Sequence, residues 1–365
     1  MTSGWVQARR ALSWTYAVPA LALVLLAVTW GSKPPALVLA VVAVFLAGAV
    51  LAAVHHAEVI AHRVGEPFGS LVLAVAVTVI EVGLIVTLMA SGGGETSTLA
   101  RDTVFAAVMI TCNGILGLSV LVGSLHRRIA SFNPEGTATA LATVATLATL
   151  SLALPAFTTT RAGPEFSPAQ LAFAGVASLA LYGLFVFVQT VRHRDYFLPV
   201  DVGADPDEHA APPTDRQTLA SLGLLVVALV SVVGLAKIET PAIEDAVAAV
   251  GAPASAVGVV IALLVLLPET LAAVRNARRD RVQTSFNLAL GSAMASIGLT
   301  IPAIALATIW LDGPLVLGLD STQTVLLAIT IVVGALTVLP GRATLQEGGV
   351  HLVLFATFLF LALVP

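Results

Sequence analysis

The stretch LAVAVTVIEVGLIVTLMA, residues 73–90, places one carboxylate, Glu81, in the middle of an otherwise uncharged apolar run. Similar apolar runs recur along the whole chain of 365 residues, of which 58% are hydrophobic and only 10% are charged. The mean hydropathy is +0.99, whereas soluble domains carry about 25% charged residues. The sequence therefore predicts an all-α polytopic membrane protein, and the question is why one of its helices carries a glutamate.

Helical spans are predicted wherever about 20 mostly apolar residues follow one another. The first such run lacks a small-residue cleavage site, so we expect a retained helix rather than a removed signal peptide. The single cysteine, Cys112, excludes an intramolecular disulfide framework. Eleven segments meet the length criterion: 14–31, 36–61, 67–90, 103–125, 137–159, 169–190, 218–236, 252–274, 283–309, 314–339 and 349–364.

The basic residues predict the orientation of these segments, because cytoplasmic loops are enriched in Lys and Arg. With the N-terminus in the cytoplasm, only four of the 17 basic residues fall outside, namely Lys33, Arg101, Arg161 and Lys237. A missed or invented segment in mid-chain would invert every later loop and remove this bias. The pattern favours a multi-pass protein of the cell membrane, with a cytoplasmic N-terminus and an outside C-terminus.

An acidic stretch, HRDYFLPVDVGADPDEHAAPPTDR at 193–216, divides the chain. It is interpreted as a solvated cytoplasmic linker, with a regulatory cation-attracting segment as the alternative. Five segments precede it after the first helix, and five follow, so the two halves enter the membrane from opposite sides. Such inverted repeats are typical of secondary transporters. We predict four parts: 1–33 with the first helix, a five-helix repeat at 34–191, the linker at 192–217, and a second five-helix repeat at 218–365.

The two predicted halves echo one another around two glutamates. GEPFGS at 65–70 and GAPASA at 251–256 each begin the second helix of a half, and the apolar runs that follow end at VTVIE (77–81) and VLLPE (265–269). An ionised carboxylate in the bilayer costs roughly 3 kcal/mol on insertion scales, so it usually faces the bundle interior and marks an ion path. The structural alternative is a glutamate that only hydrogen-bonds a neighbouring helix.

The chemistry of such a pair predicts exchange. Glu81 and Glu269 would meet near the midplane, where repeat-built transporters hold their sites. A desolvated carboxylate takes up a proton readily, whereas a hard cation such as Ca²⁺ binds the ionised form through oxygen ligands. Protons and cation would therefore compete for one site, which with alternating access gives antiport.

Several further residues are candidates to support the site. Polar residues on the predicted helices are candidate ligands, with helix packing as the alternative. Pro268 predicts an interruption of its helix, with a simple kink as the alternative. A gating or proton-relay role is conceivable for His55 and Glu58, with a structural role as the alternative. The possible supporting ligands are Thr78, Asn113, Asn287, Ser292 and Ser296.

These motifs resemble a known family. HHAEVIAHRV at 55–64 with GEPFGSLVLAVAVTVIEVGLIV at 65–86, and PETLAAVRNARRDRVQTSFNLALGSAMASIGLTIP at 268–302, resemble the two signatures of ChaA-type sodium-calcium/proton antiporters of the calcium/cation antiporter superfamily. The resemblance implies inverted five-helix repeats, each with one essential acidic residue, which correspond to Glu81 and Glu269. The cation/proton exchanger branch has a Gly-Asn pair before each glutamate and a histidine after the second, where this chain has other residues. The resemblance therefore leaves Na⁺ and K⁺ as alternatives to Ca²⁺ for the transported cation.

Taken together, the sequence predicts a secondary active antiporter that exchanges Ca²⁺, Na⁺ or K⁺ for protons at Glu81 and Glu269, and that is not an enzyme. A passive cation channel lined by the same glutamates is the first alternative, and a membrane scaffold or sensor is the second. The expected partners are the lipid bilayer and small inorganic cations, with no cofactor and no nucleic acid.

Overall fold

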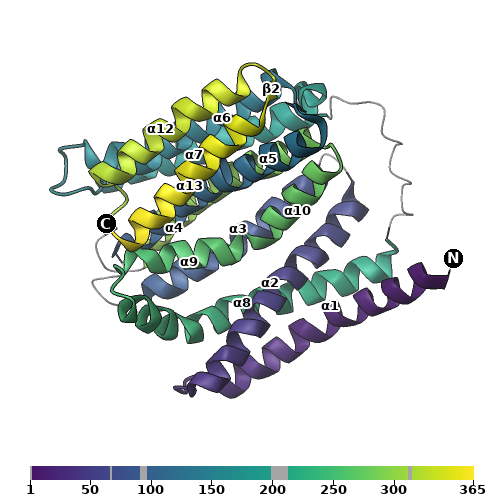
Figure 1. Ribbon diagram of the computed structural model, residues 1–365. Coiled ribbons are helices and arrows are strands. Elements are labelled where there is room, and N and C mark those ends of the chain that lie inside the picture. Colours follow the sequence, from purple (N-terminus) through teal and green to yellow (C-terminus); the bar gives the residue numbers. More distant parts are fainter. Residues whose placement is uncertain (1, 66–67, 91–96, 199–212, 311–314) are drawn as a thin grey trace. The chain divides into compact units, whose positions relative to one another are not determined.

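The computed structural model describes residues 2–65, 68–90, 97–198, 213–310 and 315–365. Helices make up nearly all of the described chain (Figure 1). The acidic residues Asp201, Asp205, Asp207 and Glu208 of the predicted linker lie outside the described residues. The α-helices are α1 (Thr2–Thr29), α2 (Ala36–Val64), α3 (Phe68–Ala90), α4 (Leu99–Met109), α5 (Leu116–Arg127), α6 (Pro134–Ala148), α7 (Pro168–Phe187), α8 (Asp215–Ala249), α9 (Ser255–Val265), α10 (Leu267–Arg278), α11 (Val282–Ala307), α12 (Ser321–Val338) and α13 (Leu345–Leu363).

Short elements join or extend these helices. Three of them are π-helices, in which one extra residue widens a helical turn. Two are 3₁₀-helices and two are short strands. They are the π-helices η2 (Ile110–Ile115), η3 (Thr149–Ala153) and η5 (Val188–Arg192), the 3₁₀-helices η4 (Leu154–Ala156) and η6 (Arg194–Phe197), and the strands β1 (Ala130–Ser131) and β2 (Arg342–Ala343).

Helix starts follow local capping chemistry more closely than hydropathy. Ser167, Asp320 and Thr344 each form a capping box, in which their side chains accept a backbone hydrogen bond from the first turn of α7, α12 and α13. The predicted segment 314–339 therefore begins too early: Asp320 caps α12, and residues 315–320 form no helix.

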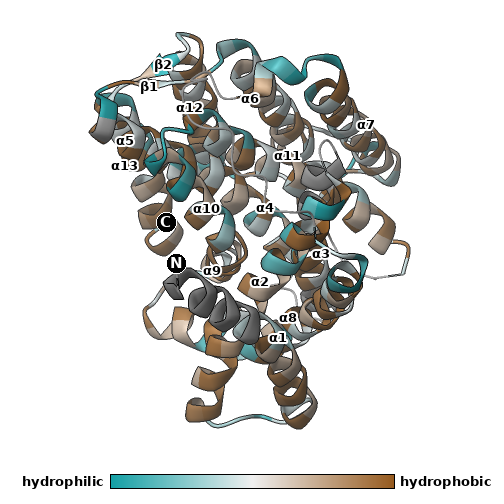
Figure 2. Ribbon diagram, turned by 90° about the vertical axis from the view of Figure 1, so that its right-hand side faces the viewer, coloured by the Kyte–Doolittle hydropathy of each residue, from teal (hydrophilic) through white to brown (hydrophobic). Residues whose placement is uncertain are grey.

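The described residues contain eight helical segments that are long and apolar enough to cross a membrane, or nine if the bent pair α9–α10 is one span. Two shorter apolar helices, Trp14–Thr29 and Val75–Thr87, lie within the predicted first and third segments. The number eleven stays a prediction. Figure 2 shows hydrophobic residues along most of the helices, as expected of a protein whose outer surface faces lipid.

The chain forms two compact units. Unit 1 comprises Met1–Thr87 and Asp207–Ala246, and unit 2 comprises Leu88–Pro206 and Val247–Pro365. Each unit draws on both predicted halves of the chain, so the units do not follow the predicted repeats. The division into repeats stays a prediction.

Unit 1 is a group of long helices around α2. Its helices pack closely where glycines remove side-chain bulk, a common device in membranes. A Cβ at Gly48 of α2 would lie 3.0 Å from Val18 of α1, and one at Gly234 of α8 would lie 2.5 Å from Leu26 of α1. The three helices α1, α2 and α8 are therefore held at short distance from one another.

Unit 2 is built around α11, which packs against α7, α10, α6 and α5. Its core side chains are fully buried, among them Phe286, Met294 and Ile297. Two further close pairs, α5 with α13 and α4 with α9, complete the packing. The helix at the centre of this packing, α11, is thus the one that carries the candidate ligands Asn287, Ser292 and Ser296.

Segments predicted on one side of the membrane lie together within unit 2. β1 pairs antiparallel with β2, and both lie in predicted cytoplasmic loops. On the opposite predicted side, Glu165 forms a bridge with Val316. The alternation of predicted sides is therefore consistent with the structure, while the side that faces the cytoplasm stays a prediction.

Candidate functional site

Glu81 lies on α3 in unit 1, and the structure buries its side chain. The residue is 3% exposed, and Thr78, one turn earlier on the same helix, is 5% exposed. Ile80, Leu84 and Ile85 surround the same level of the helix and are almost completely buried. The predicted supporting hydroxyl of Thr78 thus shares a buried environment with the Glu81 carboxylate.

α8 packs closely against α3 near the level of Glu81, at Gly83. A Cβ at Gly83 would lie 2.7 Å from Val233 of α8. Because glycine lacks a Cβ, α8 can approach α3 at this level, on a different side of the helix from Glu81. Burial of a carboxylate in apolar surroundings is costly unless a proton or a cation compensates its charge.

Glu269 lies in unit 2 at a break in the chain's path. α9 ends at Val265, α10 begins at Leu267, and the two helices are bent by 50°. Pro268 stands at the start of α10, where its missing amide hydrogen is tolerated. The prediction that Pro268 interrupts the helix is confirmed, whereas the prediction that freed carbonyls act as ligands stays untested.

The break gives Glu269 a position that Glu81 lacks. Glu269 is 5% exposed and lies in the first turn of α10. The N-terminal end of a helix carries a partial positive charge, which stabilises a nearby carboxylate in its ionised form. Glu81 lies inside an unbroken helix. The two glutamates therefore differ in electrostatic environment, although both are buried.

The hydroxyl face of α11 packs beside α10. Ser285 is fully buried and donates a 2.7 Å hydrogen bond to the carbonyl of Ala273 on α10. Ser296 is 2% exposed and Thr300 is fully buried, whereas Ser292 is half-buried. Because α10 and α11 pack against each other, α11 brings hydroxyl oxygens into the unit that holds Glu269, and Ser285 contacts α10 directly. These are ligands that hard cations accept.

Asn113 lies in the π-helix η2 and is fully buried. Its Nδ2 donates to Thr330 Oγ1 at 2.9 Å, and its Oδ1 lies 3.1 Å from Nδ1 of His351. Both ends of the amide are therefore engaged by α12 and α13. The role of Asn113 as a cation ligand stays a prediction, and in this structure its amide binds protein groups.

Asn287 belongs to another cluster. Its Nδ2 donates to the carbonyl of Phe197 at 2.6 Å, and its Oδ1 accepts from Gln283 at 2.8 Å. Gln283 also accepts from the backbone of Asn133, the residue that caps α6. Along α11, Asn287 lies about 13 Å from Ser296 at 1.5 Å per residue. The structure thus separates Asn287 from the Ser296 level, and its role as a ligand stays a prediction.

The histidines of α2 differ in burial and in hydrogen bonding. His56 is buried, and its Nε2 donates to the carbonyl of Thr15 at 2.9 Å while its Nδ1 lies 3.2 Å from Ser221 Oγ. His55 is half-buried and stacks edge-on against His56, and Glu58 is exposed. His56 therefore joins α1, α2 and α8, and the gating roles of His55 and Glu58 stay predictions.

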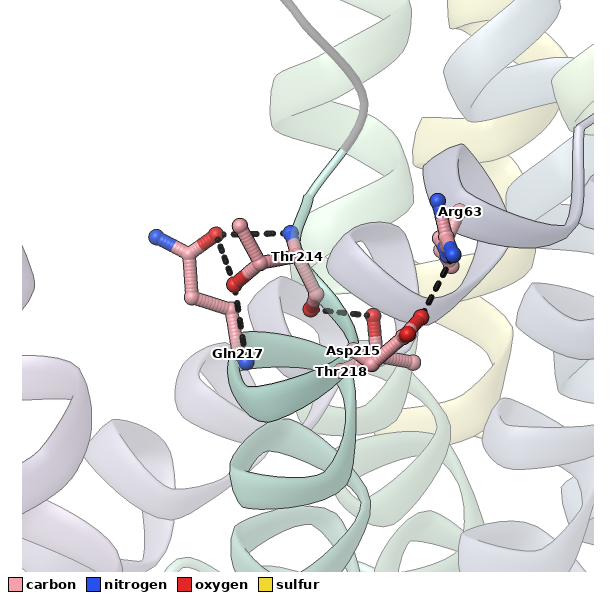
Figure 3. A network of polar contacts seen from close by, with 5 residues as sticks. All are labelled: Arg63, Thr214, Asp215, Gln217 and Thr218. Carbon is pink, nitrogen blue, oxygen red and sulfur yellow. Dashed lines mark hydrogen bonds and ion pairs between the residues drawn. The ribbon is translucent and has the colours of Figure 1, made fainter.

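The same end of α2 meets the start of α8 (Figure 3). Arg63 forms an ion pair with Asp215, both side chains being exposed. Thr214 caps α8 through reciprocal hydrogen bonds with Gln217. Both partners of the ion pair lie on the predicted cytoplasmic side, and an exposed pair of this kind adds at most about 1 kcal/mol.

Sequence reasoning missed His56 and His351 as buried hydrogen-bonding residues. A lone polar residue within an apolar run was the available signal, as it was for the glutamates. Among the residues that the structure describes, no group of three or more His, Cys, Asp or Glu side chains could hold a metal ion. A cation at Glu269 would therefore also need hydroxyl, amide or carbonyl oxygens.

Comparison with known proteins decides the family. A model of the sodium/calcium exchanger protein family matches residues 34–191 and 220–364. The chain belongs to this family. The putative ionic transporter y4hA of Sinorhizobium fredii (strain NBRC 101917 / NGR234) is 45% identical over 359 residues, which cover 96% of each chain. The sodium-potassium/proton antiporter ChaA of Escherichia coli (strain K12) is 33% identical over 346 residues, which cover 93% of each chain.

Solved structures show the same fold. The crystal structure of the H⁺/Ca²⁺ exchanger CAX is similar with a TM-score of 0.71 at 17% identity, covering 96% of this chain and 88% of that one. This member of the sodium/calcium exchanger family is thus a multi-pass membrane protein of the cation-exchange transporter class, and its relatives are transporters rather than enzymes.

Proposed function

We propose that the protein is a secondary active antiporter that exchanges Ca²⁺, Na⁺ or K⁺ for protons, with Glu81 and Glu269 as the groups that bind cation and proton in turn. The proposed location is the cell membrane, with the N-terminus in the cytoplasm and the C-terminus outside. The choice among the three cations is left to experiment, since the relatives named above carry different ions in their names.

The observation that carries the proposal is the position of Glu269. A buried carboxylate stands in the first turn of a half-helix that begins at a bend of 50°, beside a helix with buried hydroxyl groups. Broken helices with ion-binding groups at the break are typical of secondary transporters. The partial charge of the helix end favours the ionised carboxylate, and burial favours the protonated one. The binding of a cation or a proton can thus decide whether Glu269 is ionised or protonated.

The proposed repeat is supported by reciprocal contacts within unit 2. In the proposed repeat, the span containing η2 and α5 corresponds to α11, and α13 corresponds to α7. α5 crosses α13 closely at Gly117 and Gly348, and α11 crosses α7 closely at Gly298 and Gly175.

The polar contacts of unit 2 repeat in the same way. His351 of α13 contacts Thr337 of α12, and Ser178 of α7 contacts Ser151 of η3. α13 follows α12 along the chain just as α7 follows the segment that contains η3. Two helix crossings and two hydrogen bonds therefore agree with one symmetry relation, as inverted repeats require.

Transport in inside-out vesicles tests the proposal. Vesicles carrying the protein are given an inward-acid proton gradient, and Ca²⁺, Na⁺ or K⁺ is added separately while internal pH is followed. Antiport predicts that at least one cation dissipates the gradient, and that Glu81→Gln and Glu269→Gln abolish the response. Glu135→Gln, at an exposed glutamate in the first turn of α6, is the matched control. A cation flux that does not depend on the pH gradient would instead indicate a channel.

A further inference from the structure

The feature that the proposed exchange leaves unused is a buried polar cluster in unit 2. It consists of Asn113, Thr330, Thr337 and His351, each at most 2% exposed. The cluster joins η2 to α12 and α13, and it includes a histidine that is 238 positions away from its asparagine partner. A buried polar network of this kind is costly unless every group is satisfied.

The hydrogen bonds of the cluster fix the role of each ring nitrogen. The Asn113 amide donates through Nδ2 to Thr330, so its Oδ1 faces His351 and can only accept. Nδ1 of His351 therefore carries the hydrogen. Nε2 of the neutral ring then accepts from the hydroxyl of Thr337 at 3.0 Å. The imidazole thus connects an amide on one helix to a hydroxyl on another with all partners satisfied.

Two glycines bring His351 to this place. A Cβ at Gly348 of α13 would lie 2.8 Å from the backbone nitrogen of Leu121 of α5, and one at Gly117 would lie 2.9 Å from the Cβ of His351. The helices can approach this closely only because both positions lack a side chain. Asn113 lies one turn before Gly117, and His351 lies one turn after Gly348, so the close crossing sets both polar residues against each other.

Asn113 is also part of a π-helix, whose six residues are all buried. π-Helices are rare and are frequent at functional sites, because the extra residue shifts the side chains on one face of a helix. η2 packs against α11 and α10, the helices that carry Ser296 and Glu269. The cluster therefore holds η2 through Asn113, while η2 also packs against the two helices that carry Ser296 and Glu269.

We propose that His351 is a positioning residue for cation exchange: through Asn113 it holds the π-helix η2 in the form that supports α10 and α11. The proposal rests on the proposed function of Glu269. His351 itself binds no cation and carries no transported proton in this scheme. Position 351 therefore needs a side chain that donates a hydrogen bond to Asn113 Oδ1 and accepts one from the hydroxyl of Thr337.

Matched variants separate this role from general packing. His351→Leu removes both hydrogen bonds at similar volume, His351→Gln keeps a donor and an acceptor, and Thr337→Val removes one hydroxyl. The control is Thr357→Val, which removes an exposed hydroxyl from the same helix, α13. For each variant, the half-saturating cation concentration is measured in vesicles, and deuterium uptake at Ile110–Ile115 is measured on the purified protein.

We expect His351→Leu to raise the half-saturating cation concentration by about tenfold and to speed amide exchange in η2 by a similar factor, because a buried amide is left unsatisfied. Thr337→Val should change both values in the same direction by less, and His351→Gln and Thr357→Val should stay within about twofold of the original chain. If His351→Leu does not fold, Thr337→Val and His351→Gln still give this comparison.

Two results would overturn the proposal. One is an unchanged half-saturating concentration in His351→Leu and Thr337→Val. The other is an equal loss in His351→Gln and His351→Leu, which would indicate packing alone. If Glu269→Gln exchanges cations normally, the proposed function fails instead, and amide exchange in η2 still tests whether His351 holds the π-helix.

Discussion

Ser285 of α11 donates a 2.7 Å hydrogen bond to the carbonyl of Ala273 on α10, one turn beyond Glu269. The bond joins the helix that carries the candidate carboxylate to α11, the helix around which unit 2 packs. This polar contact restrains the rotation of α10 relative to α11. The helix that carries Glu269 is thus restrained by a serine that was not among the predicted supporting ligands.

Replacing this serine should weaken the attachment of α10. Ser285→Ala removes one buried hydrogen bond, so the free energy of unfolding in detergent should fall by about 1 kcal/mol. Thr146→Val, which removes an exposed hydroxyl of α6 bonded to its own helix, should change it by much less. Equal values for the two variants would show that the bond to Ala273 does not hold α10.

Replacing the proline at the break should reduce transport without reducing the stability of the protein. Pro268→Ala restores an amide hydrogen and lets α9 continue into α10, so the free energy of unfolding should stay constant or rise. Exchange should fall by more than about tenfold, since Glu269 would then lie inside a continuous helix without the partial charge of a helix end. Pro241→Ala, at an exposed proline within α8, is the control. Normal exchange by Pro268→Ala would contradict a role for the break.

The crossing of α5 and α13 can be tested with two adjacent glycines. Gly348→Ala places a Cβ 2.8 Å from the backbone nitrogen of Leu121 and should cost about 2 kcal/mol of unfolding free energy. A Cβ at Gly349 meets nothing within 4 Å, so Gly349→Ala should be neutral or slightly stabilising. The melting temperatures of both variants in detergent test this difference. Equal melting temperatures would contradict the close crossing of α5 and α13.

Competition between proton and cation predicts the direction of the pH dependence. As pH falls, protonated carboxylates bind cations less well, so the half-saturating cation concentration should rise, by up to about tenfold per pH unit for one competing proton. The maximal rate at saturating cation should change less. A half-saturating concentration that is constant with pH would argue against competition at Glu81 and Glu269.

Hydropathy was sufficient to predict the helical regions, because lipid-facing helices must be apolar along their length. Capping was decisive where hydropathy failed: Asp320 caps α12, so the helix begins at Ser321, although the apolar pattern predicted a start at residue 314. Pro268 marked its break in advance, since proline lacks the amide hydrogen that a continuous helix needs. These features are local, and local sequence contains the information for them.

The polar partners of unit 2 were beyond local reasoning. Asn113 stays a candidate ligand, and in the structure its amide contacts His351 and Thr330. Asn287 also stays a candidate, and its amide donates to the carbonyl of Phe197. Both contacts depend on which distant helices meet, and no pattern within one helix specifies that. The π-helix η2 was not predicted from the local sequence either. Its wider turns are rare in proteins, and its residues are buried among other helices.

Proton release on cation binding tests the central claim most directly. Purified protein in weakly buffered detergent solution is titrated with Ca²⁺, Na⁺ or K⁺ while a pH indicator records the protons released. Competition at the glutamates predicts that a bound cation releases protons, and that Glu269→Gln abolishes both binding and release while Glu135→Gln releases protons like the original chain. Cation binding without proton release, or release that is unchanged in Glu269→Gln, would contradict it.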